Sequence, residues 1–356
     1  MKIWLYKGGL KLISKSGIGK AFEHQKAALE EKEIEYSTKF NFGYDIVQIN
    51  TIFPDSLIVA IMAKIMRKKV IYYAHSTMED FRNSFKGSNF FAAFFKRWIK
   101  LCYSMGDIVI TPTEYSKNLL EGYGINRKII SLTNGIDLNY YKRDAELGKQ
   151  FRDKYHFNEK DKIVISVGHY IERKGIEDFA ALAERLPEYQ FLWFGYTNLN
   201  LVPCHIRSII NTKLPNLHFP GYISSEELKA AYSGSDLFLF LTHEETEGIV
   251  LLEALAMKIP ILIRDIPIYE SWFKNGKQVY KGRGLAEFKV LTKDILEGNI
   301  PNLTEEGYKT VQERSLSKVG NTLKVTYTEV LKPTAVRQEN MKKGIPTANA
   351  CHFFID

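Results

Sequence analysis

The chain has 356 residues, of which 45% are hydrophobic and 25% charged, and this size and composition are typical of two soluble globular domains. No run of the sequence reaches the roughly 18 consecutive apolar residues needed to cross a bilayer. Residues 1–7 predict a strand rather than a signal peptide. The three cysteines lie far apart and are odd in number, so they do not indicate a disulfide framework. The net charge of +8 lies in the first 150 residues, where 23 Lys and Arg stand against 15 Asp and Glu, so that half predicts a polyanionic partner.

Short apolar runs alternate with amphipathic stretches, which predicts βαβ units and parallel sheets in an α/β protein. The expected strands of the first half are residues 3–6, 46–49, 70–74, 108–111 and 129–132. Those of the second half are residues 163–167, 190–194, 217–219, 237–240 and 261–264.

The polar stretch 139–161 predicts a linker between two doubly wound, Rossmann-like domains, expected at residues 1–145 and 155–315. A terminal helix is expected at 316–331, followed by a mobile tail at 332–356. In doubly wound sheets, ligands bind at the carboxyl ends of the strands.

Gly17 and Gly19 follow the first strand and open a helical pattern. Glycines at a helix start let the backbone approach a phosphate or sugar closely, although Gly-x-Gly alone also describes an ordinary turn. We expect both glycines to line the donor site.

His75 closes the strand at 70–74, where ligands gather in such sheets. A lone histidine can equally be structural, but this position favours a catalytic role. The polar residues that follow are expected to contact an acceptor: Ser76, Glu79, Asp80 and Arg82.

The 26 residues between Asp80 and Asp107 contain no acid but combine basic and aromatic residues at helical spacing. This pattern predicts an interfacial helix that binds an anionic membrane, or alternatively a core helix with a basic edge. No nucleic-acid-binding motif surrounds it. The expected membrane contacts are Phe94, Lys96, Arg97, Trp98 and Lys100.

Arg173 and Lys174 follow the strand at 163–167, and two cations there could neutralise a diphosphate both when bound and when it departs. A solvated basic turn is the alternative. No Asp-x-Asp occurs in the sequence, so we expect no metal and no cofactor, with these cations and helix amides supplying the positive charge.

Glu245 and Glu253 stand eight positions apart around Gly248, after the apolar run 237–241. The pattern predicts a strand, an acidic turn and a helix beginning near Gly248 and Ile249. Carboxylates accept hydrogen bonds from sugar hydroxyls, and amides at a helix start suit a phosphate. Together they predict a nucleotide-sugar site, although a strand-to-helix connection with exposed acids would look similar.

This Glu-x7-Glu spacing resembles retaining glycosyltransferases of family 4, which have the GT-B fold of two facing Rossmann-like domains with a cleft between them. Further similarity lies in Gly168-His-Tyr-Ile-Glu-Arg-Lys-Gly175 and Asn134-Gly-Ile-Asp137. The family usually has Arg where this chain has His169. Two segments resemble bacterial glycolipid glucosyltransferases, which make α-diglucosyldiacylglycerol: Tyr73-Ala-His-Ser-Thr-Met-Glu-Asp-Phe-Arg-Asn-Ser-Phe85 and Thr111-Pro-Thr-Glu-Tyr-Ser-Lys117.

The resemblance implies that Glu245 holds the sugar, that Glu253 holds the ribose and that His75 lies beside the transferred sugar. It further implies transfer of α-glucose from UDP-glucose to glucosyl-diacylglycerol, by a peripheral enzyme on the cytoplasmic face of the membrane. A soluble or polyprenyl-linked glycan as acceptor, and a sugar-nucleotide epimerase or non-catalytic sugar-binding protein, are the alternatives. The sequence leaves the oligomeric state and the choice between glucose and galactose open.

Overall fold

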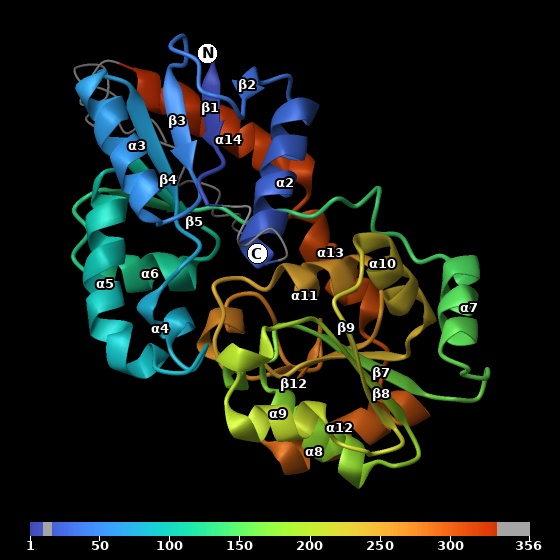
Figure 1. Ribbon diagram of the computed structural model, residues 1–356. Coiled ribbons are helices and arrows are strands. Elements are labelled where there is room, and N and C mark those ends of the chain that lie inside the picture. The colour runs from blue at the N-terminus through green and yellow to red at the C-terminus, as the bar shows by residue number, and fades with distance from the viewer. Residues whose placement is uncertain (10–15, 333–356) are drawn as a thin grey trace. The chain divides into compact units, whose positions relative to one another are not determined.

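The computed structural model describes residues 1–9 and 16–332, and its contacts divide the chain into two compact units. The first unit comprises Met1–Thr77, Ala93–Gly135 and the residues from Arg314 onward, and the second comprises Met78–Ala92 and Ile136–Glu313. Each unit contains a six-stranded, wholly parallel sheet (Figure 1). The expected tail beyond residue 332 lies outside the described residues.

The first sheet has the order β2-β1-β3-β4-β5-β6. Its strands are β1 (Ile3–Tyr6), β2 (Tyr36–Ser37), β3 (Ile46–Ile49), β4 (Lys69–Tyr73), β5 (Ile108–Thr111) and β6 (Lys128–Ser131). Its helices are α2 (Gly17–Glu31), α3 (Pro54–Ile65), α5 (Ser88–Ser104), α6 (Glu114–Gly122) and α14 (Leu316–Leu331). The short helix α4 (Met78–Phe81) precedes α5.

Strand order assigns these helices to two faces, because parallel crossovers are right-handed. Across the sheet, the chain runs one way from β1 to β2 and the opposite way from β3 through β6. With right-handed crossovers, α2 therefore covers one face of the sheet, and α3, α5 and α6 cover the other. The terminal helix α14 packs beside α2, where Gly320 lies so close to Ala28 that a Cβ would be 2.5 Å from its carbonyl oxygen. Its buried side chains complete the hydrophobic core of the first sheet.

The second sheet has the order β12-β11-β10-β7-β8-β9. Its strands are β7 (Ile163–Val167), β8 (Gln190–Phe194), β9 (Leu217–Gly221), β10 (Leu237–Phe240), β11 (Ile261–Arg264) and β12 (Tyr280–Gly282). Its α-helices are α7 (Ala145–Lys154), α8 (Ile176–Arg185), α9 (Cys204–Ile210), α10 (Ser225–Gly234), α11 (Ile249–Ala256), α12 (Leu285–Glu297) and α13 (Thr304–Gln312). Three short 3₁₀ turns are η1 (Glu172–Lys174), η2 (Leu199–Leu201) and η3 (Pro267–Tyr269).

The stretch 139–161, expected to be a linker, is instead part of the second unit. It contains α7, which packs against α10 through a close approach of Gly148 and Gly234. A Cβ at Gly148 would lie 2.9 Å from the Ser233 carbonyl oxygen, and the Phe151 ring is buried beside Gly234. The contacts place the boundary between the units earlier, after Gly135.

Candidate active site

The second sheet reverses its strand order between β7 and β10, which lie side by side. A crevice forms at the carboxyl ends of the two strands that flank such a switch point. The segment after β7 carries Arg173 and Lys174, and the segment after β10 carries Glu245. The topology therefore brings together charged residues that lie about 70 positions apart in the sequence.

Lys174 and Glu245 form a buried ion pair, in which the ammonium donates to the carboxylate. Burial alone would raise the pKa of Glu245, but the adjacent positive charges of Lys174 and Arg173 outweigh it and lower that pKa. Burial lowers the pKa of Lys174, and Glu245 opposes this shift. Glu245 is thus an ionised hydrogen-bond acceptor held against a cation.

Arg173 is almost fully buried, and its side-chain partners lie within the second unit. Its Nη1 is 2.9 Å from Asp80 Oδ1 and donates to the Glu244 carbonyl oxygen, while its Nε donates to Ser84 Oγ at 3.1 Å. Nη1 also lies 4.0 Å from Glu245. Arg173 and Lys174 therefore place two positive charges beside one carboxylate.

Asp80 lies in the segment Met78–Ala92, whose contacts group it with the second unit. Burial raises the pKa of Asp80, although Arg173 opposes the shift. The sequence suggests that Asp80 meets an acceptor, but in the structure its carboxylate is bound by Arg173. His169, at the position where the family usually has Arg, donates from Nδ1 to the Tyr196 carbonyl oxygen at 2.8 Å, and burial lowers its pKa.

Glu253 lies in α11 and is 3% exposed. One carboxylate oxygen accepts a 2.6 Å hydrogen bond from the Tyr141 hydroxyl, and the other accepts from Tyr232 at 3.2 Å. The sequence analysis missed both tyrosines, because no local motif links them to Glu253. The only signal is that Tyr141 closely follows the Asn-Gly-Ile-Asp motif.

Gly248 begins α11 with a φ of 90°, a left-handed conformation that favours glycine. A Cβ there would lie 2.8 Å from the Tyr269 hydroxyl, which itself donates to the Glu247 carbonyl oxygen. The residues at the start of α11, Ile249 included, present backbone N–H groups that have no intrahelical partner by helix geometry. Such groups bind anions.

In the first unit, His75 follows β4 and is 8% exposed. Its ring stacks on Tyr73 with 4.8 Å between the ring centres, and its Nε2 lies 3.1 Å from Asn50 Oδ1. Burial lowers the pKa of His75 to about 3, so the ring is neutral near pH 7. Gly17 and Gly19 lie in the first turn of α2, and a Cβ at Gly17 would meet no atom within 4 Å.

The other expected acceptor contacts lie around α4. Ser76 is held through its backbone, since its N–H and carbonyl oxygen both pair with the Tyr103 hydroxyl. Glu79 is half-buried in α4, and Arg82, which follows it, is exposed.

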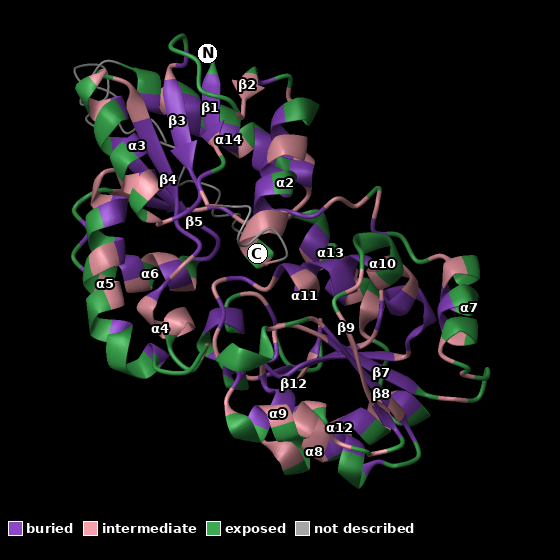
Figure 2. Ribbon diagram, in the orientation of Figure 1, coloured by how far each residue is buried: buried purple, intermediate pink, exposed green. Residues whose placement is uncertain are grey.

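The basic and aromatic residues of α5 divide into two sets. Phe94, Arg97 and Lys100 are exposed, together with Phe90, which is 84% exposed. Figure 2 shows that α5 carries exposed stretches along its length. Trp98 is half-buried and donates from Nε1 to the Ile52 carbonyl oxygen at 2.7 Å, so it anchors the helix.

Lys96, like Trp98, points toward the interior of the first unit, because its ammonium lies 4.4 Å from the centre of the Tyr123 ring. The helix therefore combines a core side with an exposed side that is both aromatic and basic. None of the helices in the described part of the chain is both long and apolar enough to cross a bilayer.

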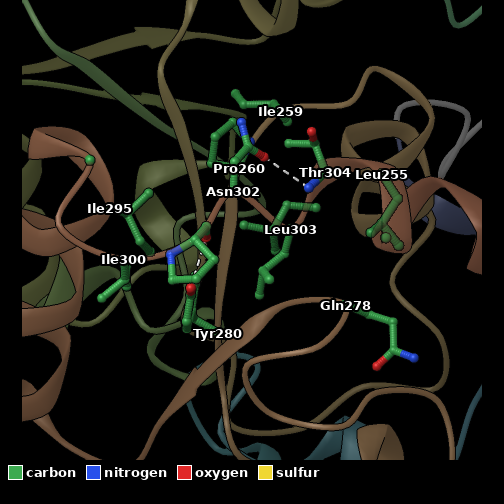
Figure 3. Close-up of a pocket in the computed structure, with 14 residues that line it drawn as sticks. Leu255, Ile259, Pro260, Gln278, Tyr280, Ile295, Ile300, Asn302, Leu303 and Thr304 are labelled. Carbon is green, nitrogen blue, oxygen red and sulfur yellow. Dashed lines mark hydrogen bonds between the residues drawn. The ribbon is translucent and has the colours of Figure 1, made fainter.

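The second unit contains a cavity of about 130 Å³. Figure 3 shows residues that line it, among them the apolar side chains of Leu255, Ile259 and Ile295. Its polar contacts are internal: the Tyr280 hydroxyl donates to the Pro301 carbonyl oxygen, and the Thr304 N–H donates to Asn302. None of the candidate site residues lines it. Within residues 1–9 and 16–332, no three His, Cys, Asp or Glu side chains are placed to bind a metal ion.

Two family models match the chain: "Glycosyltransferase Family 4" over residues 35–140 and "Glycosyl transferases group 1" over residues 149–297. The processive diacylglycerol alpha-glucosyltransferase of Acholeplasma laidlawii is 41% identical over 335 residues, covering 93% of this chain and 99% of that protein. The alpha-galactosylglucosyldiacylglycerol synthase of Streptococcus pneumoniae is 26% identical, covering 69% of this chain and 67% of that protein.

Solved structures agree on the fold. HepE of Anabaena, crystallised with UDP-glucose, has a TM-score of 0.72 at 16% identity, covering 92% of this chain and all of that one. Sucrose-phosphate synthase of Thermosynechococcus elongatus has a TM-score of 0.66 at 16% identity, covering 88% and 78%. The family matches, the near full-length relative and the two parallel sheets agree with one another: the chain belongs to glycosyltransferase family 4 and is a glycosyltransferase with the GT-B fold.

Proposed function

We propose that this glycosyltransferase transfers α-glucose from UDP-glucose to glucosyl-diacylglycerol at an anionic membrane surface on the cytoplasmic face. The observation that carries the proposal is the 41% identity to a processive diacylglycerol alpha-glucosyltransferase across nearly the whole of both chains. The name of that relative supports a glycolipid acceptor and a glucosyl group. UDP-glucose as donor is supported by the candidate site, whose cations and carboxylates suit a diphosphate and a polyol.

The proposed donor site lies at the switch point of the second sheet. Lys174 and Arg173 bind the diphosphate, Glu253 accepts hydrogen bonds from the ribose hydroxyls, and Glu245 accepts them from the glucose. Lys174 already balances the negative charge of Glu245. A diphosphate that binds there would therefore share the Lys174 ammonium with Glu245, and would not be repelled by an unpaired carboxylate. These cations and the start of α11 supply the positive charge that a metal ion would otherwise provide.

Transfer with retention then proceeds on one face of the glucose. The bond between the anomeric carbon and the phosphate oxygen breaks as the bond to the acceptor oxygen forms. The acceptor proton passes to the departing phosphate of UDP. Glu245 is a poor nucleophile for a double displacement, because its carboxylate is held in an ion pair with Lys174.

Two neighbouring helices of the first unit support membrane binding. Besides the exposed side of α5, α3 carries an exposed apolar stripe at helical spacing: Ile58, Ile61, Met62 and Ile65. Ile65 is 77% exposed, and the basic run 67–69 follows it. The bond from Trp98 of α5 to Ile52 brings α5 close to the loop that precedes α3. Apolar side chains flanked by Lys and Arg are typical of surfaces that enter an anionic lipid interface.

The test is a transfer assay with radiolabelled UDP-glucose or UDP-galactose, offered diacylglycerol or monoglucosyl-diacylglycerol in anionic vesicles. Formation of diglucosyl-diacylglycerol from UDP-glucose and the monoglucosyl lipid is expected, with retained configuration in the product. Transfer only to soluble sugars, or only from UDP-galactose, would overturn the proposed acceptor or donor respectively.

A further inference from the structure

A continuous chain of buried hydrogen bonds runs through the first unit from the terminal helix to His75. The Tyr327 hydroxyl of α14 donates to Gln48 Oε1 at 2.5 Å, and Gln48 Nε2 donates to Gln25 Oε1 at 2.7 Å. Gln25 Nε2 donates to Asn50 Oδ1 at 2.7 Å, and the same oxygen lies 3.1 Å from His75 Nε2. Tyr327, Gln48 and Gln25 have no exposed surface, and Asn50 is 2% exposed. We call these four residues the amide relay.

The relay lies at the switch point of the first sheet. Strand order reverses between β1 and β3, and Asn50 directly follows β3 at its carboxyl end. His75 follows the adjacent strand β4, and Gln25 comes from α2, the helix after β1. This end of a doubly wound sheet is where ligands bind.

Turning a side-chain amide by 180° exchanges its oxygen and its nitrogen, so the amides of the relay could donate in either direction. The residue at the end of the relay decides between the two directions. Tyr327 provides that end, because a hydroxyl must donate its hydrogen, and within the described residues its only hydrogen-bond partner is Gln48 Oε1. Burial raises the pKa of Tyr327, which keeps the hydroxyl protonated. With Gln48 accepting from Tyr327, Gln48 donates to Gln25, and Gln25 donates to Asn50.

At the His75 end of the relay, Asn50 by itself would not favour the observed direction of hydrogen-bond donation. Asn50 Nδ2 is buried and has no partner in residues 1–9 and 16–332, and an unpaired buried donor is a free-energy cost. If the amides turned over, this nitrogen would donate to Gln25 and His75 instead. The observed direction therefore depends on the Tyr327 hydroxyl.

The relay determines which ring nitrogen of His75 carries the proton. Asn50 Oδ1 is an acceptor, so the Nε2 that faces it must be the protonated nitrogen of a neutral ring. Nδ1 then holds a lone pair, and it makes no hydrogen bond to any described residue. Stacking on Tyr73, at 10° between the ring planes, fixes the direction in which Nδ1 points.

We propose that the amide relay holds His75 in the Nε2-protonated tautomer, so that Nδ1 accepts a hydrogen bond from a glucose hydroxyl of the substrate. Asn50, Gln25, Gln48 and Tyr327 are then positioning residues for sugar recognition. His75 acts as a hydrogen-bond acceptor and not as a general base. The identity of the sugar rests on the proposed function, whereas the tautomer does not.

The experiment is long-range ¹H–¹⁵N correlation on the full chain labelled with ¹⁵N-histidine, which distinguishes protonated from unprotonated ring nitrogens. The His75 signals are assigned by their loss in His75→Gln. Tyr327→Phe removes the first link of the relay, and Gln48→Met removes the first and second links together. Tyr72→Phe is the matched control, since Tyr72 is also fully buried in this unit and its hydroxyl takes no part in the relay.

The wild type and Tyr72→Phe are expected to show a single Nε2-protonated tautomer, and the two relay variants a mixture. With both tautomers comparably populated, only about half of the molecules can accept the sugar hydroxyl, so the apparent KM for UDP-glucose should rise about twofold. A wild-type ring protonated on Nδ1, or relay variants that keep one tautomer, would overturn the role of the relay. If Tyr327→Phe does not fold, Gln48→Met decides the question by the same criterion.

Addition of UDP-glucose is expected to shift the Nδ1 resonance of His75, whereas UDP, which lacks the glucose, is expected to leave it unchanged. An Nδ1 resonance that responds to neither ligand would overturn the sugar contact. Absence of UDP-glucose binding by calorimetry would instead show that the proposed donor is wrong, while the spectra of the free protein still decide the tautomer.

Discussion

The Tyr141 hydroxyl donates a 2.6 Å hydrogen bond to Glu253, across 112 positions of the sequence and wholly within the second unit. Tyr232 binds the other carboxylate oxygen. A carboxylate held by two buried hydroxyls has one orientation, and its remaining lone pairs point in fixed directions. In the proposed donor site, this geometry preorganises Glu253 for the ribose.

Replacing Glu253 by Ala is expected to weaken UDP binding about tenfold or more, because the ribose hydroxyls lose a buried acceptor worth roughly 1–3 kcal/mol. Tyr141→Phe should have a smaller effect in the same direction, about 1 kcal/mol, since the carboxylate remains but is less well oriented. Isothermal calorimetry with UDP measures both, with Tyr140→Phe as the neighbouring control. Unchanged affinity in Glu253→Ala would contradict the ribose assignment.

Replacing Lys174 by Ala is expected to lower turnover about 10²–10³-fold and to weaken UDP binding less, because charge placed on a leaving group acts most in the transition state. The exposed Lys160→Ala serves as the control. Wild-type activity should survive EDTA. Turnover above about a third of the wild-type value in Lys174→Ala would rule out the leaving-group role, and strong inhibition by EDTA would indicate a metal ion.

The Asp80–Arg173 ion pair makes a distinct prediction. If the diphosphate and Asp80 compete for the same guanidinium, Asp80→Asn should strengthen UDP binding a few-fold, since it removes one anion and keeps the side-chain shape. Ser84→Ala, which removes a neutral partner of Arg173, is the comparison. Weaker UDP binding in Asp80→Asn would show instead that Asp80 orients Arg173 for the donor.

Membrane attachment should depend on charge and on apolar burial in separable ways. Neutralising Arg97 and Lys100 together with Lys96 should release the protein from anionic vesicles at low salt, because each exposed charge near the surface contributes on the order of 1 kcal/mol, screened by salt. Arg97 and Lys100 should account for the loss, since the Lys96 ammonium lies over the Tyr123 ring. UDP binding should not change. Co-sedimentation across a salt series measures this effect, and a triple variant that still binds like wild type would mean that α5 serves only the core.

The apolar part of attachment is expected to persist at high salt. Phe94→Ser in α5 and Ile65→Ser in α3 should each weaken it, because both side chains are largely exposed and available to lipid. Val290→Ser, an exposed apolar residue of α12 in the second unit, is the matched control and should have no effect. Equal losses in all three variants would point to nonspecific hydrophobic adsorption.

His75 should make the free energy of unfolding sensitive to acid. Burial lowers its pKa to about 3 in the folded chain from the ordinary value of 6.5 in the unfolded chain, so between these pH values the unfolded chain binds the extra proton and stability falls as the pH falls. At pH 5 the loss is about 2 kcal/mol. His75→Gln should therefore lose less stability between pH 7 and pH 5 in urea titrations than wild type or the exposed control His205→Gln. Equal losses in all three proteins would contradict a depressed pKa.

The sequence predicts ten of the twelve strands in residues 1–9 and 16–332, because nearly all of the ten are short apolar runs bounded by polar residues. The two short edge strands, β2 and β12, escape prediction since they are two and three residues long and only half-buried. The stretch 139–161 looks like a linker by composition. Its helix is polar on most sides, and only Gly148 and Phe151 are buried against α10.

Within the candidate site, the sequence predicts residues that carry charge at strand ends and helix starts, because topology places those positions at the ligand-binding edge. It does not predict their partners. Tyr141, Tyr232 and the amide relay are neutral side chains distant in sequence from the residues they hold, so no spacing rule identifies them. Trp98 was expected in the lipid-facing set, yet its indole N–H is used to bind Ile52.

The position of α14 has a consequence for how the protein is made. Residues 316–331 pack against the core of the first sheet and leave the ribosome about 200 residues after Gly135. At the usual 5–20 residues per second, that is roughly 10–40 s during which the core around Ile3, Ile71 and Ile130 lacks its last helix. The second unit, apart from its short segment Met78–Ala92, is synthesised within that interval. The unit that begins the chain is thus the last to be completed, and ribosome-bound chains stalled before residue 316 should depend most on chaperones.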